Sequence, residues 1–284
     1  MKLGLILEGG ASRAYFSCGM LEALEKENIM ADMLVGTSAG IADGVSYITK
    51  QSRRNYYIAT RFLSDPRYMG LPHMLNRKNR SYYNLSFVFG DIPNKHLPFN
   101  YRAFAEYPGE VLAAVTNLRT GKVEYLPVPR DDTSFKVLQA SCALPLLFPP
   151  IEIDGTPYMD GGIVNSIPLQ PALEANYDKI IVILTQPRGY QKKRSKGMEL
   201  MAKRYHRYPA FSEALKNRYL TYNQELANIA ELEKEGRVFV MAPKESLAIE
   251  RTERNPNVLG NLYQLGYDTF YEYWPALQAY LEAK

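Results

Sequence analysis

The chain has 284 residues, a formal net charge of +4, 46% hydrophobic residues and two cysteines, a composition typical of a soluble protein with one large core. No apolar run is long enough for a signal peptide or a membrane span, and the cysteines form no C-x-x-C pair, which argues against a disulfide framework or a zinc site. We therefore expect a cytoplasmic protein without a metal or another cofactor.

Apolar strands alternate with helices from the first residues onward. Residues 3–7 predict a buried strand, the small-residue loop 8–14 follows, and helical spacing of apolar residues predicts a helix over 15–27. The loop can present backbone N–H groups to an anion, either a nucleotide phosphate or a transient oxyanion, or it is a tight turn without a ligand. It matches neither glycine pattern of nucleotide-binding proteins, which disfavours the nucleotide.

A Gly-x-Ser-x-Gly sequence follows the second predicted strand, residues 31–36. Its defined positions are Gly36, Ser38 and Gly40, and a helix is predicted from residue 39 to about 50. On a sharp strand-to-helix turn a serine is pushed outward and its neighbours must be small, while the helix start directs N–H groups toward the serine. Ser38 is therefore a candidate nucleophile, and a plain helix N-cap is the alternative.

The middle of the chain is irregular before it returns to strands. Residues 52–104 are rich in tyrosine, arginine and proline, so we expect short helices and loops that cover the site. A short helix is predicted over 134–141. Two hairpins are predicted on either side of it, formed by strands 111–116 with 122–128 and by strands 151–153 with 156–159.

A serine nucleophile needs a group that takes its proton. The chain has three histidines, each in a polar, loop-like or basic context that favours an exposed side chain: His73, His96 and His206. A carboxylate can serve instead if burial raises its affinity for protons. Asp160 is the best candidate, because it follows a strand and because Gly161 and Gly162 after it permit close approach. A second Asp-Gly turn is the alternative, although Asp154-Gly155 already supplies the reversal.

The last third adds strands and long helices. Strands are predicted over 180–184 and 237–241, a long helix over 211–235, and a helix over 258–284 that is interrupted near Pro275. This alternation predicts a mainly parallel sheet covered on both faces, a three-layer α/β/α sandwich. The loops that follow parallel strands meet at one edge of such a sheet, and a site is expected there.

Lysine and arginine crowd residues 188–207, where Glu199 is the single acid. A solvated face is the favoured interpretation, and docking on anionic lipid headgroups is the alternative. No nucleic-acid-binding motif accompanies this run.

Three elements taken together resemble the patatin-like phospholipases, which are serine lipid acyl hydrolases with a Ser–Asp dyad. They are Gly9-Gly10-x-x-Arg13, Gly36-x-Ser38-x-Gly40 and Asp160-Gly161-Gly162. Residues 140–145, 148–150 and 165–168 are similar to that family's surroundings of the aspartate. The resemblance covers roughly residues 1–187 and implies that Ser38 is the nucleophile, that Asp160 is the base and that calcium is not needed.

The resemblance also implies an oxyanion hole in the loop of Gly9, Gly10, Ala11 and Arg13, with main-chain N–H donors around Gly10 and Ala11. The family loop usually reads Gly-Gly-Gly-x-Arg/Lys-Gly, whereas Ala11 and Ala14 replace two of its glycines here. Alanine keeps its N–H, but a positive φ at either position would cost energy.

The resemblance divides the chain into a catalytic domain over 1–187 and a C-terminal extension over 188–284. The extension is similar to one found in some bacterial patatin-like proteins, is expected to be mostly helical and packed on the catalytic domain, and carries no assigned chemistry.

The predicted function is a serine esterase of the phospholipase A, lysophospholipase or esterase type, acting on a lipid or another acyl ester. A Ser–His esterase or acyltransferase is one alternative and requires one of the three histidines. A non-catalytic lipid- or anion-binding protein is another, which Ala11 and Ala14 favour. A nucleotide-binding protein comes last. The sequence predicts neither the headgroup preference nor the oligomeric state.

Overall fold

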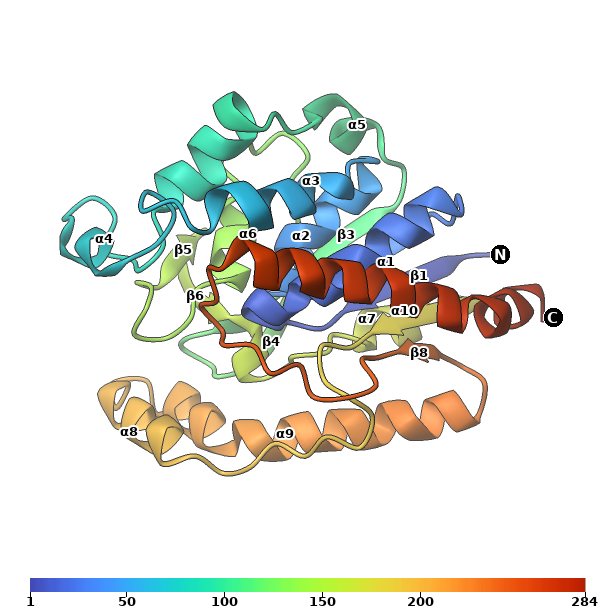
Figure 1. The fold of residues 1–284 in the computed structure, drawn as a ribbon. Coiled ribbons are helices and arrows are strands. Elements are labelled where there is room, and N and C mark those ends of the chain that lie inside the picture. Colours follow the sequence, from blue (N-terminus) through green and yellow to red (C-terminus); the bar gives the residue numbers. More distant parts are fainter. Residues whose placement is uncertain (284) are drawn as a thin grey trace.

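The computed structural model describes residues 1–283 and is built on one eight-stranded sheet (Figure 1). The strands are β1 (Leu3–Leu7), β2 (Met33–Thr37), β3 (Glu110–Asn117), β4 (Val123–Pro127), β5 (Ile151–Ile153), β6 (Thr156–Asp160), β7 (Lys179–Ile183) and β8 (Phe239–Met241). Their order is β5-β6-β3-β2-β1-β7-β8, with β4 paired to β3. Pairing is parallel from β3 to β8, and antiparallel where β4 and β6 join β3 and β5 joins β6.

Helices cover both faces of the sheet, which confirms the predicted three-layer architecture. They are α1 (Ala14–Lys26), α2 (Ala39–Ile48), α3 (Arg53–Tyr57), α4 (Leu71–Leu75), α5 (Tyr101–Glu106), α6 (Lys136–Ser141), α7 (Gln170–Glu174), α8 (Lys196–Arg204), α9 (Pro209–Lys234) and α10 (Pro256–Glu282). Shorter helical turns are η1 (Ala11–Arg13), η2 (Ile58–Phe62), η3 (Phe87–His96) and η4 (Gly161–Ile163). Figure 1 shows α1, α2 and α10 on one face of the sheet and α9 on the other.

Alternating side chains of the central strands explain why both faces are covered. In β1, Leu5 and Leu7 belong to the apolar cluster beneath α1, α2 and α10, whereas Ile6 belongs to the cluster beneath α7 and α9. Because successive strand residues point to opposite faces, a continuous apolar run requires a helical layer on each side.

Two glycines allow α10 to lie directly on α1. A Cβ atom on Gly19 would come within 2.0 Å of the Tyr263 carbonyl oxygen, and a Cβ atom on Gly266 within 1.8 Å of the Phe16 carbonyl oxygen. Neither position has room for a side chain, so the two helix backbones touch. This contact attaches the C-terminal helix to the first helix of the chain.

The predicted interruption near Pro275 is wrong, because α10 continues through it to Glu282. Proline lacks the N–H that would donate to the preceding turn, but tertiary contacts hold the residues beyond it. Leu277 is fully buried, and the Tyr280 hydroxyl accepts from the Ile180 N–H and donates to the Arg237 carbonyl. The predicted division at residue 187 stays a prediction, and β8 beyond it pairs with β7.

Candidate active site

The carboxyl ends of β2 and β6 meet along one edge of β3. Thr37, the last residue of β2, pairs with Ala114, and Asp160, the last residue of β6, pairs with the next residue, Val115. Since β4 occupies the opposite edge of β3 at the same positions, β2 and β6 lie end to end on the same side. This register brings Ser38 and Asp160 together from positions far apart in the sequence.

Ser38 stands on a tight turn between β2 and α2. Its backbone has φ 54° and ψ −129°, a conformation that costs about 1–3 kcal/mol for a residue other than glycine. A Cβ atom on Gly36 would lie 2.7 Å from the Ile41 nitrogen, and one on Gly40 would lie 2.8 Å from the Leu7 and Glu8 carbonyl oxygens. The positions two residues before and two residues after the serine must therefore be glycine, as the motif requires.

The Ser38 hydroxyl donates a 2.7 Å hydrogen bond to Oδ2 of Asp160. The other carboxylate oxygen, Oδ1, accepts a 2.7 Å bond from the Gly162 N–H. Asp160 is 2% exposed, and this burial raises the pKa of its carboxyl, partly offset by the bonds from Ser38 and Gly162. A carboxylate with increased proton affinity, bonded to a serine hydroxyl, is suited to act as a general base.

Backbone and hydroxyl contacts hold the dyad in place. The Ser38 N–H donates to the Ser141 hydroxyl, which in turn donates to the Ala114 carbonyl oxygen. The Asp160 N–H donates to the Ala143 carbonyl oxygen, and the Asp160 carbonyl accepts from the Thr116 hydroxyl. The positioning role of Ser141 was missed in the sequence, because nothing in its local pattern shows that α6 ends beside Ser38.

The loop after β1 places two free backbone donors beside Ser38. The Gly9 N–H donates to the Ser166 carbonyl oxygen and is therefore occupied, which corrects its expected place among the oxyanion-hole residues. Within residues 1–283, the N–H groups of Gly10 and Ala11 have no hydrogen-bond acceptor. These two donors line a cavity together with Ser38 and Asp160.

Ala11 adopts a positive φ of 48°, whereas Ala14 has a helical φ of −62°. Of the two alanines that replace family glycines, only Ala11 therefore occupies a conformation that favours glycine. Ala11 lines the cavity in this conformation.

Arg13 lines the same cavity, and burial lowers the pKa of its guanidinium. Two further arginines, Arg218 on α9 and Arg251 in the loop before α10, line it as well. Neither residue could be predicted from the sequence, since both lie far from any motif and reach the site only through the packing of α9 and α10.

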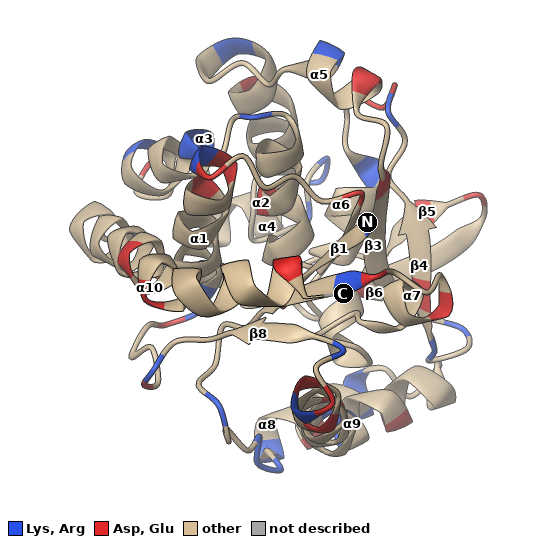
Figure 2. Ribbon diagram, turned by 90° about the vertical axis from the view of Figure 1, so that its right-hand side faces the viewer, with Lys and Arg blue, Asp and Glu red and all other residues tan. Residues whose placement is uncertain are grey.

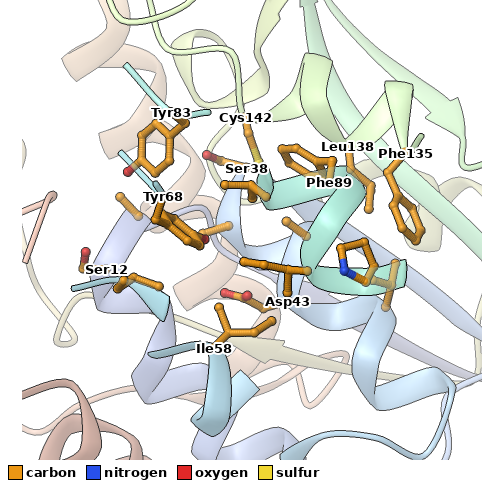
Figure 3. Close-up of a pocket in the computed structure, with 18 of the residues that line it drawn as sticks. Ser12, Ser38, Asp43, Ile58, Tyr68, Tyr83, Phe89, Phe135, Leu138 and Cys142 are labelled. Carbon is orange, nitrogen blue, oxygen red and sulfur yellow. The ribbon is translucent and has the colours of Figure 1, made fainter. Parts of the chain in front are cut away.

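A larger, mostly apolar pocket of about 1030 Å³ opens on the other side of Ser38. Figure 3 shows the rings of Tyr68, Tyr83, Phe89 and Phe135 around it, with Ser38 beside Cys142. One wall comes from residues 52–104, which form the short helices expected of a cover.

Asp43 is the acidic residue in the wall of this pocket (Figure 3). Burial raises the pKa of Asp43 to about 7, against the lowering effect of Cys18 and Arg54. The lining also includes Ser12 and Arg54, but it is mostly apolar and suited to a hydrocarbon chain.

The histidines lie elsewhere. All three are among the described residues, and none lines either cavity. His73 and His206 contact the backbone carbonyls of Pro66 and Lys203, and the ring of His96 lies against Phe62 and Phe87. A Ser38–His pair is thus not formed.

The basic run is largely a surface feature. Figure 2 shows blue Lys and Arg residues on α8, and Arg194, which precedes this helix, forms a salt bridge with Glu199. Lys192 differs from its neighbours, since its ammonium lies 3.4 Å from the centre of the Tyr222 ring. No helix in the described part of the chain is both long and apolar enough to cross a bilayer. Over the same residues, no group of three or more His, Cys, Asp or Glu side chains is arranged to hold a metal ion.

Comparisons with known proteins agree with this geometry. The family model for patatin-like phospholipase matches residues 5–173, and a model for a domain of unknown function (DUF6363) matches residues 198–282. The structure of VipD from Legionella pneumophila has a TM-score of 0.50 at 13% identity, over 97% of this chain and 67% of that one, a similarity of fold alone.

Curated relatives include fungal proteins named lysophospholipase NTE1. That of Cryptococcus neoformans is 30% identical over 207 residues, and that of Candida albicans 25% over 181 residues. The alignments cover 66% and 64% of this chain but 12% and 13% of those proteins, so the chain corresponds to a small part of each. Because the patatin-like model matches more than half of its length, the chain belongs to the patatin-like phospholipase family.

Proposed function

We propose that this protein is a serine lipid acyl hydrolase that cleaves acyl esters through a Ser38–Asp160 dyad and a covalent acyl-enzyme. The observation that carries the proposal is the 2.7 Å bond from the Ser38 hydroxyl to Asp160, at a point where an apolar pocket and two free N–H donors meet. Nucleophile, base and oxyanion donors are the three parts that acyl transfer needs.

In the proposed reaction, the Ser38 oxygen attacks the ester carbonyl carbon while its proton moves to Asp160. The carbonyl oxygen becomes an oxyanion and accepts hydrogen bonds from the N–H groups of Gly10 and Ala11. The tetrahedral intermediate then expels the alcohol, which takes the proton from Asp160. Water, losing a proton to Asp160, attacks the acyl-serine, and release of the carboxylic acid returns that proton to the Ser38 oxygen.

The substrate class follows from the pocket and from the relatives. The large apolar pocket fits a hydrocarbon chain, and proteins named lysophospholipases are among the relatives of this chain. We therefore propose a lipid ester as the substrate. Contact of the basic α8 region with an anionic membrane surface, in a cytoplasmic location, is proposed as the way the protein reaches it.

A non-catalytic lipid-binding protein is the second candidate, and the positive φ of Ala11 is the observation that favours it. If strain at Ala11 displaced the oxyanion donors, lipid would bind without being cleaved. Reaction of Ser38 with a fluorophosphonate probe separates the hydrolase from the lipid-binding protein.

The test is reaction with a fluorophosphonate probe, followed by mass spectrometry of the modified peptide. We expect modification at Ser38 in the wild-type protein, loss of it in Ser38→Ala and strong reduction in Asp160→Asn. Two controls should react like the wild type: Ser86→Ala, at an exposed serine, and Asp154→Asn, at the exposed β5–β6 turn. A folded wild-type protein that is not modified would contradict the hydrolase and support the lipid-binding protein.

A further inference from the structure

Three arginines face the small cavity beside Ser38. This cavity has a volume of about 360 Å³ and is lined by Arg13, Arg218 and Arg251 as well as by Ser38 and Asp160. The arginines come from three distant parts of the chain, η1, α9 and the loop before α10. Their convergence on one small space is therefore a property of the tertiary structure.

Backbone contacts fix each of these segments. Arg218 donates a 2.5 Å hydrogen bond from Nε to the Gly162 carbonyl oxygen. The Arg251 carbonyl oxygen accepts a 2.8 Å bond from the Ser12 hydroxyl, which ties its loop to η1. The arginines are thus held close to the dyad without any ligand.

Within residues 1–283, these guanidinium groups form no salt bridge with a carboxylate. In the part of the chain that the structure describes, arginine salt bridges are formed by Arg53, Arg67, Arg102, Arg188 and Arg194. The Arg13 Nε is buried and has no hydrogen-bond acceptor within residues 1–283. The negative charges of Glu8 and Asp160 act on Arg13 and Arg218, but over the same residues they form no salt bridge with them. Three guanidinium groups around one small space are therefore suited to an anion from outside the chain.

The nearby carboxylates accept their hydrogen bonds from groups other than these arginines. Asp160 accepts from Ser38 and Gly162, and Glu8 accepts from the Tyr222 hydroxyl and the Thr185 N–H. Glu225 lies close to Lys192 and Glu8, and burial raises its pKa to about 8, so that it contributes little negative charge at neutral pH.

Lys192 lies near the cluster. Burial, and to a smaller extent the positive charge of Arg218, lowers its pKa to about 6. A bound anion would act against this lowering, because a negative charge nearby favours the ammonium form.

The two cavities meet at the reacting serine. Ser38, Ala11 and Leu144 line both the large apolar pocket and the small cationic one. An ester that places its acyl chain in the apolar pocket and its carbonyl carbon at Ser38 directs its alcohol portion into the arginine cavity. The alcohol portion should therefore carry a compact anion, and a phosphate matches the planar donor arrays of several guanidinium groups.

We propose that Arg13, Arg218 and Arg251 form a subsite for the phosphate of a lysophospholipid headgroup, so that the substrates are acyl esters with a phosphate-bearing alcohol. This inference rests on the proposed function and names its substrate class. Two of the three arginines lie beyond residue 173, so the C-terminal part of the chain supplies most of this specificity.

The test compares two soluble short-chain esters with the same acyl group, 1-hexanoylglycerol 3-phosphate and 1-hexanoylglycerol. We expect the wild type to have a kcat/KM at least about tenfold higher for the phosphate ester, and Arg251→Gln to lower that ratio by about 10-fold to 100-fold, as for loss of a charge-assisted hydrogen bond. Arg251→Lys, which keeps the charge, should retain part of the preference. Arg207→Gln, at an exposed arginine of the basic run outside both cavities, should keep all of it.

Two results would overturn the proposal. One is a wild-type ratio near one, and the other is an equal loss of kcat/KM for both esters in Arg251→Gln, which would assign the arginine to the oxyanion instead.

If neither ester is hydrolysed, that result counts against the proposed function but not against the subsite. The subsite is then tested by calorimetric measurement of the binding of both esters to the Ser38→Ala variant. We expect the phosphate ester to bind at least about tenfold more tightly than the neutral ester, and Arg251→Gln in the same background to remove the difference. Inorganic phosphate is the third ligand. If it binds while the lipid phosphate brings no gain over the neutral ester, the site holds a free anion and the headgroup assignment is wrong.

Discussion

The Tyr222 hydroxyl donates a 2.8 Å hydrogen bond to Oε1 of Glu8 and so joins α9 to the end of β1. Glu8 is 2% exposed, and its other oxygen accepts from the Thr185 N–H. A buried carboxylate needs such donors, and one of the two comes from the C-terminal part of the chain.

Tyr222→Phe removes this donor and should lower the free energy of unfolding by about 1.5–3 kcal/mol, the usual range for a hydrogen bond to a charged group. Denaturant unfolding measures the change. Tyr219→Phe is the matched control on the same helix, because the Tyr219 hydroxyl has no hydrogen-bond partner within the described residues. Equal stability of the two variants would mean that the hydrogen bond from α9 to the Glu8 carboxylate does not contribute to the free energy of unfolding.

Asp160→Asn should remove activity and stabilise the fold at the same time. Burial raises the pKa of Asp160, so the ionised carboxylate lowers stability above the folded-state pKa, and the penalty vanishes below the ordinary aspartate pKa of about 3.9. We expect a higher thermal midpoint than wild type at about pH 8, no advantage near about pH 3.5, and a loss of kcat of about 10³-fold or more. Asp154→Asn, in the exposed turn, should change neither quantity. A lower midpoint at pH 8 would contradict the assigned cost of burying the charge.

The rate of acyl-enzyme formation should increase with pH, because Asp160 accepts the Ser38 proton only when it is ionised. Since its pKa is raised, the acidic limb should lie above the range of an exposed aspartate. Fluorophosphonate reaction rates between about pH 4 and pH 9 measure this limb. Simultaneous replacement of His73, His96 and His206 by Gln should leave this acidic limb at the same pH. A shift of the limb in that variant would mean that a histidine, and not Asp160, is the titrating group.

Ala11→Gly should increase stability slightly. The positive φ of Ala11 is strained for alanine, whereas glycine adopts it freely. Because the unfolded chain of the variant is more flexible, part of this gain is lost, and we expect the free energy of unfolding to increase by up to about 1 kcal/mol. Ala14→Gly is the matched control at a helical φ and should destabilise by about 0.5–1 kcal/mol. The same pair tests the active site, since Ala11→Gly keeps the N–H donor. A large gain in activity would show that strain at Ala11 displaces the oxyanion donors.

The contact between α1 and α10 makes two glycines of one helix respond in opposite ways. Gly266→Ala places a methyl group 1.8 Å from the Phe16 carbonyl oxygen and should destabilise the protein by about 3 kcal/mol or more. Gly260→Ala meets its nearest atoms at 3.6 Å, so the higher helix propensity of alanine should stabilise by up to about 1 kcal/mol. Thermal unfolding of both variants is the measurement, and similar behaviour of the two would disprove the close helix contact.

Local patterns predicted the parts of the site that are encoded locally. The turn at Ser38 needs a glycine two residues away on each side, and two glycines follow the aspartate that ends β6, so both residues could be selected from short segments. Arg218 and Arg251 could not be selected, because an arginine on a long helix or in a loop has no local signal for the cavity it faces. The predicted interruption of the helix at Pro275 was wrong for a related reason: the packing of Leu277 and Tyr280, which the local sequence does not show, outweighs the hydrogen bond lost at the proline. The family loop groups Gly9 with the oxyanion-hole residues, and the sequence could not show that its N–H is occupied, because the partner of that N–H, the Ser166 carbonyl, lies in a distant loop.

The end-to-end placement of β2 and β6 along β3 has a consequence for how the protein is made. Ser38 leaves the ribosome long before Asp160, and the two meet only after β3 has paired with both strands. A one-residue slip of β6 would move Asp160 by about 3.3 Å and turn its side chain to the opposite face of the sheet. In the nascent chain Ser38 is therefore not yet paired with Asp160, and the proposed hydrolase activity is acquired only when the sheet is complete.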